Sequence, residues 1–183
     1  GRDPNAYGRT DNPLHYLSAK ASYRAGINLV TAGVDYKSES LFDEAVAYHR
    51  VIDDDYDNFG AYLQDEIDFL ERYHVVAGAR VDNNSLLDDP IFSPRVSALA
   101  ELTENINVRG NVSTGFKAPQ VFDEDLHITQ VGGEGQIIRN DDDLSEEKSV
   151  SVSGSIEMSR QINSQFVKVG LTGFHTMLDD QFQ

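Results

Sequence analysis

Apolar and polar residues alternate along most of this chain. In residues Phe92–Pro119, the first strand has apolar positions at Val96, Ala98, Ala100 and Leu102 and polar positions at Ser93, Arg95, Ser97 and Glu101. After a turn at Glu104-Asn105, the same period continues through Ile106, Val108 and Val112. A period of two with one wet face indicates half-buried antiparallel strands.

The same pattern recurs and predicts about eight long strands in four hairpins, an all-β antiparallel meander. The hairpins are His15–Arg24 with Ile27–Ser38, Asn58–Leu70 with Tyr73–Asn83, Phe92–Pro119, and Lys148–Ser159 with Asn163–Leu178. We expect the other three turns at Ala25-Gly26, Glu71-Arg72 and residues 160–162. The last strand is ambiguous, because Phe166 and Phe174 fall opposite Val167, Val169 and Leu171. Helical spacing is not sustained anywhere.

Short turns within the hairpins alternate with long polar connections at Glu39–Asp57, Asn84–Ile91 and Gln120–Glu147. Strands of ten or more residues with this alternation are typical of outer-membrane barrels. A soluble β-sandwich or meander alternates in the same way, so the pattern alone supports both. The absence of Trp and the sparse aromatic residues count against the barrel.

Composition narrows the function classes. The chain has 15 basic and 31 acidic residues and a formal net charge of −16, which argues against nucleic-acid binding. The acidic runs Asp53–Asp57, Asp123–Asp125 and Asp141–Asp143 predict solvated loops. Asp53–Asp57 and Asp141–Asp143 could bind Ca²⁺ through oxygen ligands, but neither has the full spacing of a calcium loop, which favours the solvated loop. There is no Cys and no run of roughly 20 apolar residues. The first residues are not an apolar signal segment, and the chain stops within a predicted strand, so we expect a fragment.

Several motifs resemble those of TonB-dependent outer-membrane receptors. Ser113–Pro119, Ser-Thr-Gly-Phe-Lys-Ala-Pro, is similar to the family's "GFRAP" motif, with Lys117 where Arg is usual. Phe92–Leu99 resembles the strand that enters this hairpin, and Asn58–Glu66 with Val75–Asp82 resembles another barrel hairpin. Asn140–Ser149 partly resembles the "NPDLKPE-x-S" box but lacks both of its prolines. The resemblance covers roughly Leu29–Ser159.

The resemblance implies that residues 1–183 are part of a roughly 22-strand outer-membrane barrel of a Gram-negative bacterium, without its plug domain and signal peptide. It further implies TonB-energised uptake of a scarce nutrient complex, namely a ferric siderophore, haem or cobalamin, with an oligosaccharide as a further option. An open piece of barrel exposes two sheet edges, so we expect the isolated chain to self-associate as a homo-oligomer or to pack non-natively. The alternative is a self-contained eight-strand β-barrel or a soluble β binding module.

The candidate ligand-binding residues are Lys117, Asp123, Asp125 and His127, in or next to the loop Gln120–Arg139. The resemblance places His127 where some haem importers of the family carry a histidine, so it is a candidate haem ligand. The Gly132–Gly135 run is expected to form a turn. No resident cofactor or metal is expected. The histidines lie on different elements and no serine lies in a nucleophile elbow, so we predict no enzyme. Arg80, Arg95 and Arg109 alternate with acids, as in a wet interior.

Overall fold

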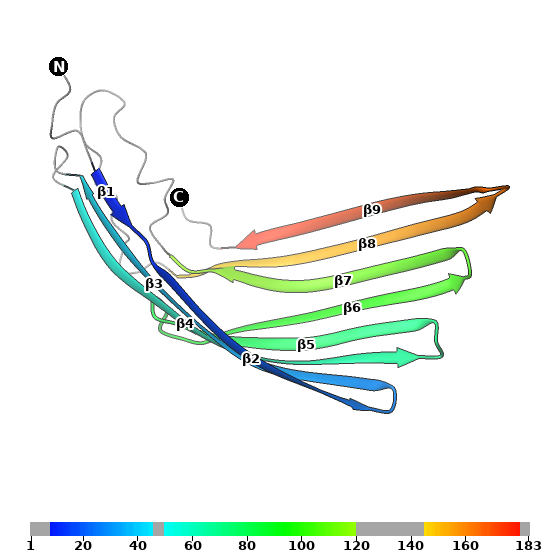
Figure 1. Cartoon of the computed structure of the whole chain (residues 1–183), viewed down its shortest axis with the longest axis horizontal. Coiled ribbons are helices and arrows are strands. Elements are labelled where there is room, and N and C mark those ends of the chain that lie inside the picture. Colours follow the sequence, from blue (N-terminus) through cyan, green and yellow to red (C-terminus); the bar gives the residue numbers. More distant parts are fainter. Residues whose placement is uncertain (1–7, 46–49, 120–144, 180–183) are drawn as a thin grey trace, which may run out of the picture.

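A computed structural model of the chain describes residues 8–45, 50–119 and 145–179. These residues form one antiparallel sheet of nine strands (Figure 1). The strands are β1 (Gly8–Asp11), β2 (Leu14–Ala25), β3 (Asn28–Ala45), β4 (Arg50–Phe69), β5 (Tyr73–Asn84), β6 (Ile91–Thr103), β7 (Ile106–Lys117), β8 (Glu147–Ile162) and β9 (Gln165–Asp179). No helix able to cross a membrane occurs within these ranges.

The prediction of an all-β antiparallel meander is confirmed. The eight predicted strands correspond to β2–β9, and each pairs with its neighbour along the chain. The sheet is a single curved layer that does not close on itself, so β9 lies at one edge and β1 with β2 at the other (Figure 1). Self-association of the isolated chain stays a prediction.

The prediction of a long loop over Glu39–Asp57 is wrong. Strand β3 continues to Ala45 and β4 begins at Arg50, with Glu39 opposite Tyr56 and Phe42 opposite Asp53. Cross-strand hydrogen bonds hold the acidic residues in place, because the Ser40 hydroxyl donates to Asp55 at 2.6 Å. The hairpin β3–β4 therefore extends well beyond the neighbouring strands.

Strand β1, which the pattern did not predict, pairs with this extended part of β3, from Gly8 opposite Ala45 to Asp11 opposite Phe42. It continues the line of β2 after an interruption at Asn12 and Pro13. Proline has no N–H to donate, so a sheet edge is where it is tolerated. The Pro13 carbonyl still accepts from Ser40 N at 3.1 Å, which keeps the interruption against the sheet.

The turns lie close to their predicted places. Gly26 has a φ of 62°, and the turn after β4 places Leu70 and Glu71 at φ values of 52° and 58°. The last turn differs from the prediction, because β8 continues to Ile162 and the chain reverses at Asn163 and Ser164. Asn163 has a φ of 56°, a conformation that asparagine tolerates better than most residues.

The register gives the sheet two chemically distinct faces. The apolar face carries Val34, Ala61 and Val81 side by side, and farther along the sheet Val112 lies opposite Val152. The polar face carries most of the charged and hydroxyl side chains. The ambiguity of β9 is resolved, because Val169 lies opposite Met158 and Leu171 opposite Ile156. Phe166 and Phe174 therefore belong to the polar face.

Burial is concentrated at the loop end of the sheet, the end that carries the long connections. Leu41 and Tyr56 are 2% and 6% exposed and pack with Ile52 and Leu86. Leu86 belongs to the connection between β5 and β6, so this contact fixes that connection against the extended hairpin. Elsewhere large apolar side chains are exposed, including Leu17 and Leu171 at 73% each.

Candidate functional site: the polar face of the sheet

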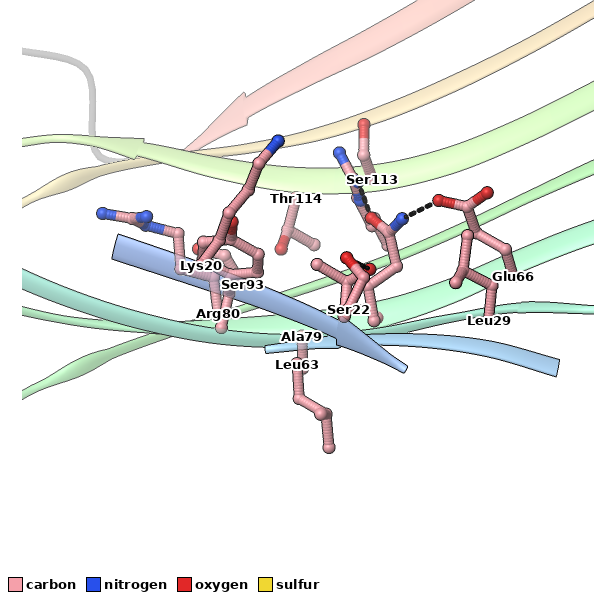
Figure 2. Close-up of a pocket in the computed structure, with 15 residues that line it drawn as sticks. Lys20, Ser22, Leu29, Leu63, Glu66, Ala79, Arg80, Ser93, Ser113 and Thr114 are labelled. Atoms are coloured by element: carbon pink, nitrogen blue, oxygen red, sulfur yellow. Dashed lines mark hydrogen bonds between the residues drawn. The ribbon is translucent and has the colours of Figure 1, made fainter. Parts of the chain in front are cut away.

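A hollow of about 650 Å³ lies on the polar face, bordered by residues of β2–β7. Figure 2 shows Lys20 and Glu66 rising on one side of the sheet, whereas Leu63 points to the other side. Hydroxyl groups from several strands complete the lining, namely those of Ser22, Thr31, Ser93 and Ser113. The lining of the hollow is therefore polar and includes several cationic side chains.

Two glycines let large side chains lie flat along the wall of this hollow. A Cβ at Gly33 would meet the Tyr62 ring at 2.5 Å, and a Cβ at Gly60 would meet Arg80 Nη2 at 1.9 Å. Each large side chain covers a glycine on a neighbouring strand, an arrangement that fills the gap left by the missing side chain. Gly33 and Gly60 thus determine where Tyr62 and Arg80 lie.

Arg80 is held by two acids near the loop end of the hollow. Its guanidinium donates to Asp35 at 2.6 and 2.8 Å and to Asp82 at 2.7 and 2.6 Å. Asp35 and Asp82 are 7% and 2% exposed, and Asp82 also accepts from Asn58 Nδ2 at 2.8 Å. Two charge-assisted forks that join β3 and β5 make this cluster structural.

Two other cations of the hollow have no acidic partner. Arg95 donates to Gln64 Oε1, and Gln64 in turn donates to Glu66 at 2.9 Å. Within the described part of the chain, no ion pair joins Lys20 or Arg95 to a carboxylate. Their charges are exposed to the solvent in the hollow.

A second hollow of about 320 Å³ lies closer to the turn end of the sheet and is lined by residues of β5–β9. Ser97 of β6 and Asn111 of β7 lie in it, and Ser97 donates to Asn111 Oδ1 at 2.6 Å. Arg109 supplies its cation and is likewise without an ion pair among the described residues. His74 also lines this hollow, and its Nδ1 is hydrogen-bonded to Asp68 at 2.8 Å. The polar face is therefore hollowed at two successive levels.

Hydrogen bonds also order the loop end. The Tyr36 hydroxyl donates to Asp57 at 2.6 Å and lowers the pKa of that carboxyl group. Lys37 lies 2.7 Å from Glu39, and this hydrogen bond lowers the pKa of Glu39, although partial burial opposes the shift. Asp57 N also donates to Ser85 Oγ at 3.0 Å, which ties the extended hairpin to the β5–β6 connection.

Of the candidate ligand-binding residues, the structure describes Lys117 alone. It ends β7 opposite Glu147, on the same face as Ser113 and at the loop end of the sheet. Asp123, Asp125 and His127 lie outside the described residues, as does the Gly132–Gly135 run.

Alternation also divides the acidic run of β4. Asp54 lies on the polar face, whereas Asp53, Asp55 and Asp57 lie on the other. Among the described residues no group of acids and histidines is arranged to hold a metal ion.

Lys20, Tyr62 and Gln64 line the larger hollow but were missed by sequence reasoning. The signal for Tyr62 is a glycine on the facing strand, which becomes visible only once the register is known.

The apolar face has the dimensions of a membrane-crossing sheet. It runs on β4 from Phe59 to Phe69, and Tyr36 and Tyr73 add aromatic rings at its two ends. Ten residue steps of about 3.4 Å give about 34 Å, and a barrel tilt of about 40° reduces this to about 26 Å, close to the height of about 25 Å of an apolar barrel band. An apolar band with aromatic ends, backed by a polar face, defines part of a transmembrane β-barrel wall.

The comparisons place this wall in a family. The model of the family described as TonB dependent receptor-like, beta-barrel, matches residues 1–183, and the chain belongs to this family of outer-membrane proteins. The iron-regulated outer membrane virulence protein of Vibrio cholerae serotype O1 is 30% identical over 159 residues, which cover 85% of this chain and 23% of that protein.

Solved structures share the fold. The siderophore receptor PirA from Pseudomonas aeruginosa has a TM-score of 0.77 at 21% identity, covering 93% of this chain and 33% of the receptor. A variant of the ferric enterobactin receptor PfeA from the same species, in complex with enterobactin, has a TM-score of 0.70 at 18% identity, covering 95% and 28%. The chain thus spans about a quarter to a third of the length of these relatives. In a barrel of this kind the polar face lines the lumen and the apolar face contacts lipid.

Proposed function

We propose that the receptor containing this chain takes up an iron chelate across the outer membrane with energy supplied through TonB. The relative from Vibrio cholerae, named as iron-regulated, carries the proposal because its similarity extends over most of this chain. The structural neighbours named as siderophore receptors support the same class of ligand.

The lumen wall has the chemistry that such transport requires. A polar face with open hollows lets a hydrogen-bonding chelate pass without contact with lipid. The hydrogen-bonded hairpin β3–β4 and its contact with Leu86 provide a firm loop end to the described sheet. We therefore assign the described residues to the passage and the loop end, and initial capture to the loops.

Radioactive iron uptake by iron-starved cells tests the proposal. The receptor gene is deleted and restored, and uptake is measured with iron bound to an anionic tris-catecholate, to a neutral tris-hydroxamate and to porphyrin as haem. We expect deletion to abolish uptake of one chelate class, and dissipation of the proton gradient to do the same in restored cells. Equal uptake with and without the receptor would refute the function.

The same assay tests the candidate haem ligand. If His127 ligates haem iron, His127→Ala lowers haem affinity in the full receptor and leaves uptake of the other two chelates unchanged. Unchanged haem binding in this variant would remove His127 from the site while leaving the chelate proposal intact.

A further inference from the structure

The extended part of β4 has an edge that no described strand covers. Strand β4 pairs with β3 along the hairpin from Arg50 onward, but its pairing with β5 begins only at Asn58, opposite Asn84. The backbone edge of residues 50–56 on the β5 side is therefore open over about 20 Å at the usual rise of a strand. Figure 1 shows this part of the hairpin projecting beyond β5.

Closure of the barrel does not cover this edge. In a closed barrel further strands pair with the free sides of β9 and β2, whereas β4 lies inside the sheet, between β3 and β5. Strand β5 ends at Asn84, and the connection after it meets the edge of β4 at Asp57. There Ser85 N donates to Asp57 O at 2.9 Å, and Asp57 N donates to Ser85 Oγ at 3.0 Å. Leu86 packs on the lumen side of the hairpin rather than along its edge.

The hydrogen bonds at Asp57 also show which backbone groups point to the open side. Both the N–H and the C=O of Asp57 point away from β3. Every second residue of an antiparallel strand directs its backbone groups to the same side, so those of Val51, Asp53 and Asp55 point to the open side as well. No described residue pairs with them there. Such a row of donors and acceptors is a template for an added strand.

A row of carboxylates determines which strand can be added. Asp53 and Asp55 point to the outer side of the hairpin and Asp54 to the lumen side, and all three are exposed. Asp55 accepts from the Ser40 hydroxyl at 2.6 Å, a neutral partner that leaves the negative charge in place. Within the described ranges no ion pair joins a cationic side chain to these acids. The edge is therefore anionic as well as open.

This charge disfavours two occupants and favours a third. A second copy of the same edge would place Asp opposite Asp, and like charges directly opposite each other destabilise a strand pair. The loop of residues 120–144 contains the acidic runs Asp123–Asp125 and Asp141–Asp143, so it is disfavoured for the same reason. A strand with Lys or Arg at every second position would instead place cations opposite Asp53 and Asp55.

We propose that residues 50–56 of β4 bind an extended cationic peptide segment by strand addition at the outer surface of the cell. The long connections of outer-membrane barrels face the outside, and residues 50–56 lie beyond Phe59, where the apolar band ends. The backbone ladder supplies affinity, and the carboxylates supply the preference for Lys and Arg. The interaction does not depend on which chelate the receptor takes up.

Binding of a short peptide to the full receptor in detergent tests the proposal. The probe is a fluorescent peptide that alternates lysine with valine, and binding is measured by fluorescence anisotropy. We expect it to bind, and the same peptide with glutamate in place of lysine not to bind. A peptide that keeps the lysines but has proline in place of two valines should bind about tenfold more weakly, because proline lacks the N–H of the ladder. Failure of the lysine–valine peptide to bind would overturn the proposal, since the edge would then be covered by another part of the receptor.

Receptor variants separate the backbone from the charge. Val51→Pro removes an N–H on the open side and keeps the bonds between β3 and β4, so we expect affinity to fall about tenfold, whereas Val51→Ala should retain it. D53N/D55N should lower affinity by up to about tenfold at low salt, because it removes two exposed charge pairs. D88N/D89N is the matched control, because it removes two exposed acids of the β5–β6 connection, away from the edge, and should leave affinity unchanged. Gel mobility of unheated samples verifies that each variant is folded.

Two further results would overturn strand addition. Unchanged affinity in folded Val51→Pro, together with equal binding of the lysine peptides with and without proline, would mean that charge alone attracts the peptide. An equal loss of affinity in D88N/D89N and D53N/D55N would mean that the attraction belongs to the acidic surface as a whole and not to the edge of β4.

Discussion

Removal of the Arg80 guanidinium should destabilise the barrel more than removal of any other lumen arginine that the structure describes. Arg80→Met keeps most of the length of the side chain but eliminates four hydrogen bonds to Asp35 and Asp82. Both carboxylates are almost fully buried, so the variant leaves two uncompensated charges. Breaking a buried pair by removing one partner costs about 3–5 kcal/mol. Because the Arg80 side chain is 33% exposed, water reaches one side of the cluster and we expect a loss of about 3 kcal/mol, the low end of that range.

The assay is a urea titration of the full receptor in detergent, with the folded fraction read from the gel mobility of unheated samples. Arg95→Met is the matched control, because Arg95 donates to Gln64 and has no acidic partner. We expect the control to lose less than about 1 kcal/mol, as exposed polar interactions do.

A second comparison isolates the cause. Adding D35N and D82N to Arg80→Met removes the buried charges, so the triple variant should regain most of the lost stability. If Arg80→Met unfolds at the same urea concentration as Arg95→Met, or if the triple variant is less stable than Arg80→Met, the reasoning about buried charge is wrong.

Three further predictions concern other parts of the wall. Gly60→Ala should cost less than the loss of Arg80 but more than Gly110→Ala in the same titration. Its Cβ would meet Nη2 at 1.9 Å, so the flexible end of Arg80 must shift and weaken its bonds to the acids, whereas a Cβ at Gly110 meets nothing within 4 Å. Asp65→Asn should raise the unfolding free energy by about 1 kcal/mol, because one carboxylate oxygen has no partner on the lipid-facing side, and an unchanged urea midpoint would contradict this. Glu39→Gln should reduce the loss of stability on acidification. The folded-state pKa of Glu39 lies below its usual value of 4.5. Its contribution to the free energy of unfolding is therefore present above that value and is lost as pH falls through the lowered pKa. Parallel profiles of stability against pH for the variant and the native protein would contradict this prediction.

Most of the sheet could be predicted because alternation is a local property. Each hairpin carries its own period of two, and turn residues such as Gly26 and Asn163 accept the backbone conformation that a reversal requires. The extension of β3–β4 was not predicted, because runs of acidic residues usually form solvated loops. Backbone pairing and bonds such as Ser40 to Asp55 outweigh that tendency, since the acids lie on the surface of a hairpin that remains wet.

The site was less predictable because it depends on register over long separations. Arg80 and Asp35 are 45 residues apart, and nothing in either segment indicates that they meet. The sequence pattern did place Arg80, Arg95 and Arg109 in a wet interior, which the register supports by putting all three on the polar face. It did not distinguish the paired arginine from the unpaired ones, because that depends on which acids lie on neighbouring strands.

The net charge of the chain does not predict the charge on the lumen side, because side chains alternate between the two faces of the sheet and only one face lines the lumen. The chain carries a formal charge of −16, yet three acids of the densest described run, Asp53, Asp55 and Asp57, lie on the outer side of β4. On the polar face acids and bases are nearly matched, and Asp35, Asp82 and Glu66 beside the first hollow accept hydrogen bonds from neighbouring side chains. A barrel wall can therefore be acidic as a whole and still present unpaired cations along its passage. The charge that faces the lumen is a property of one face and its register.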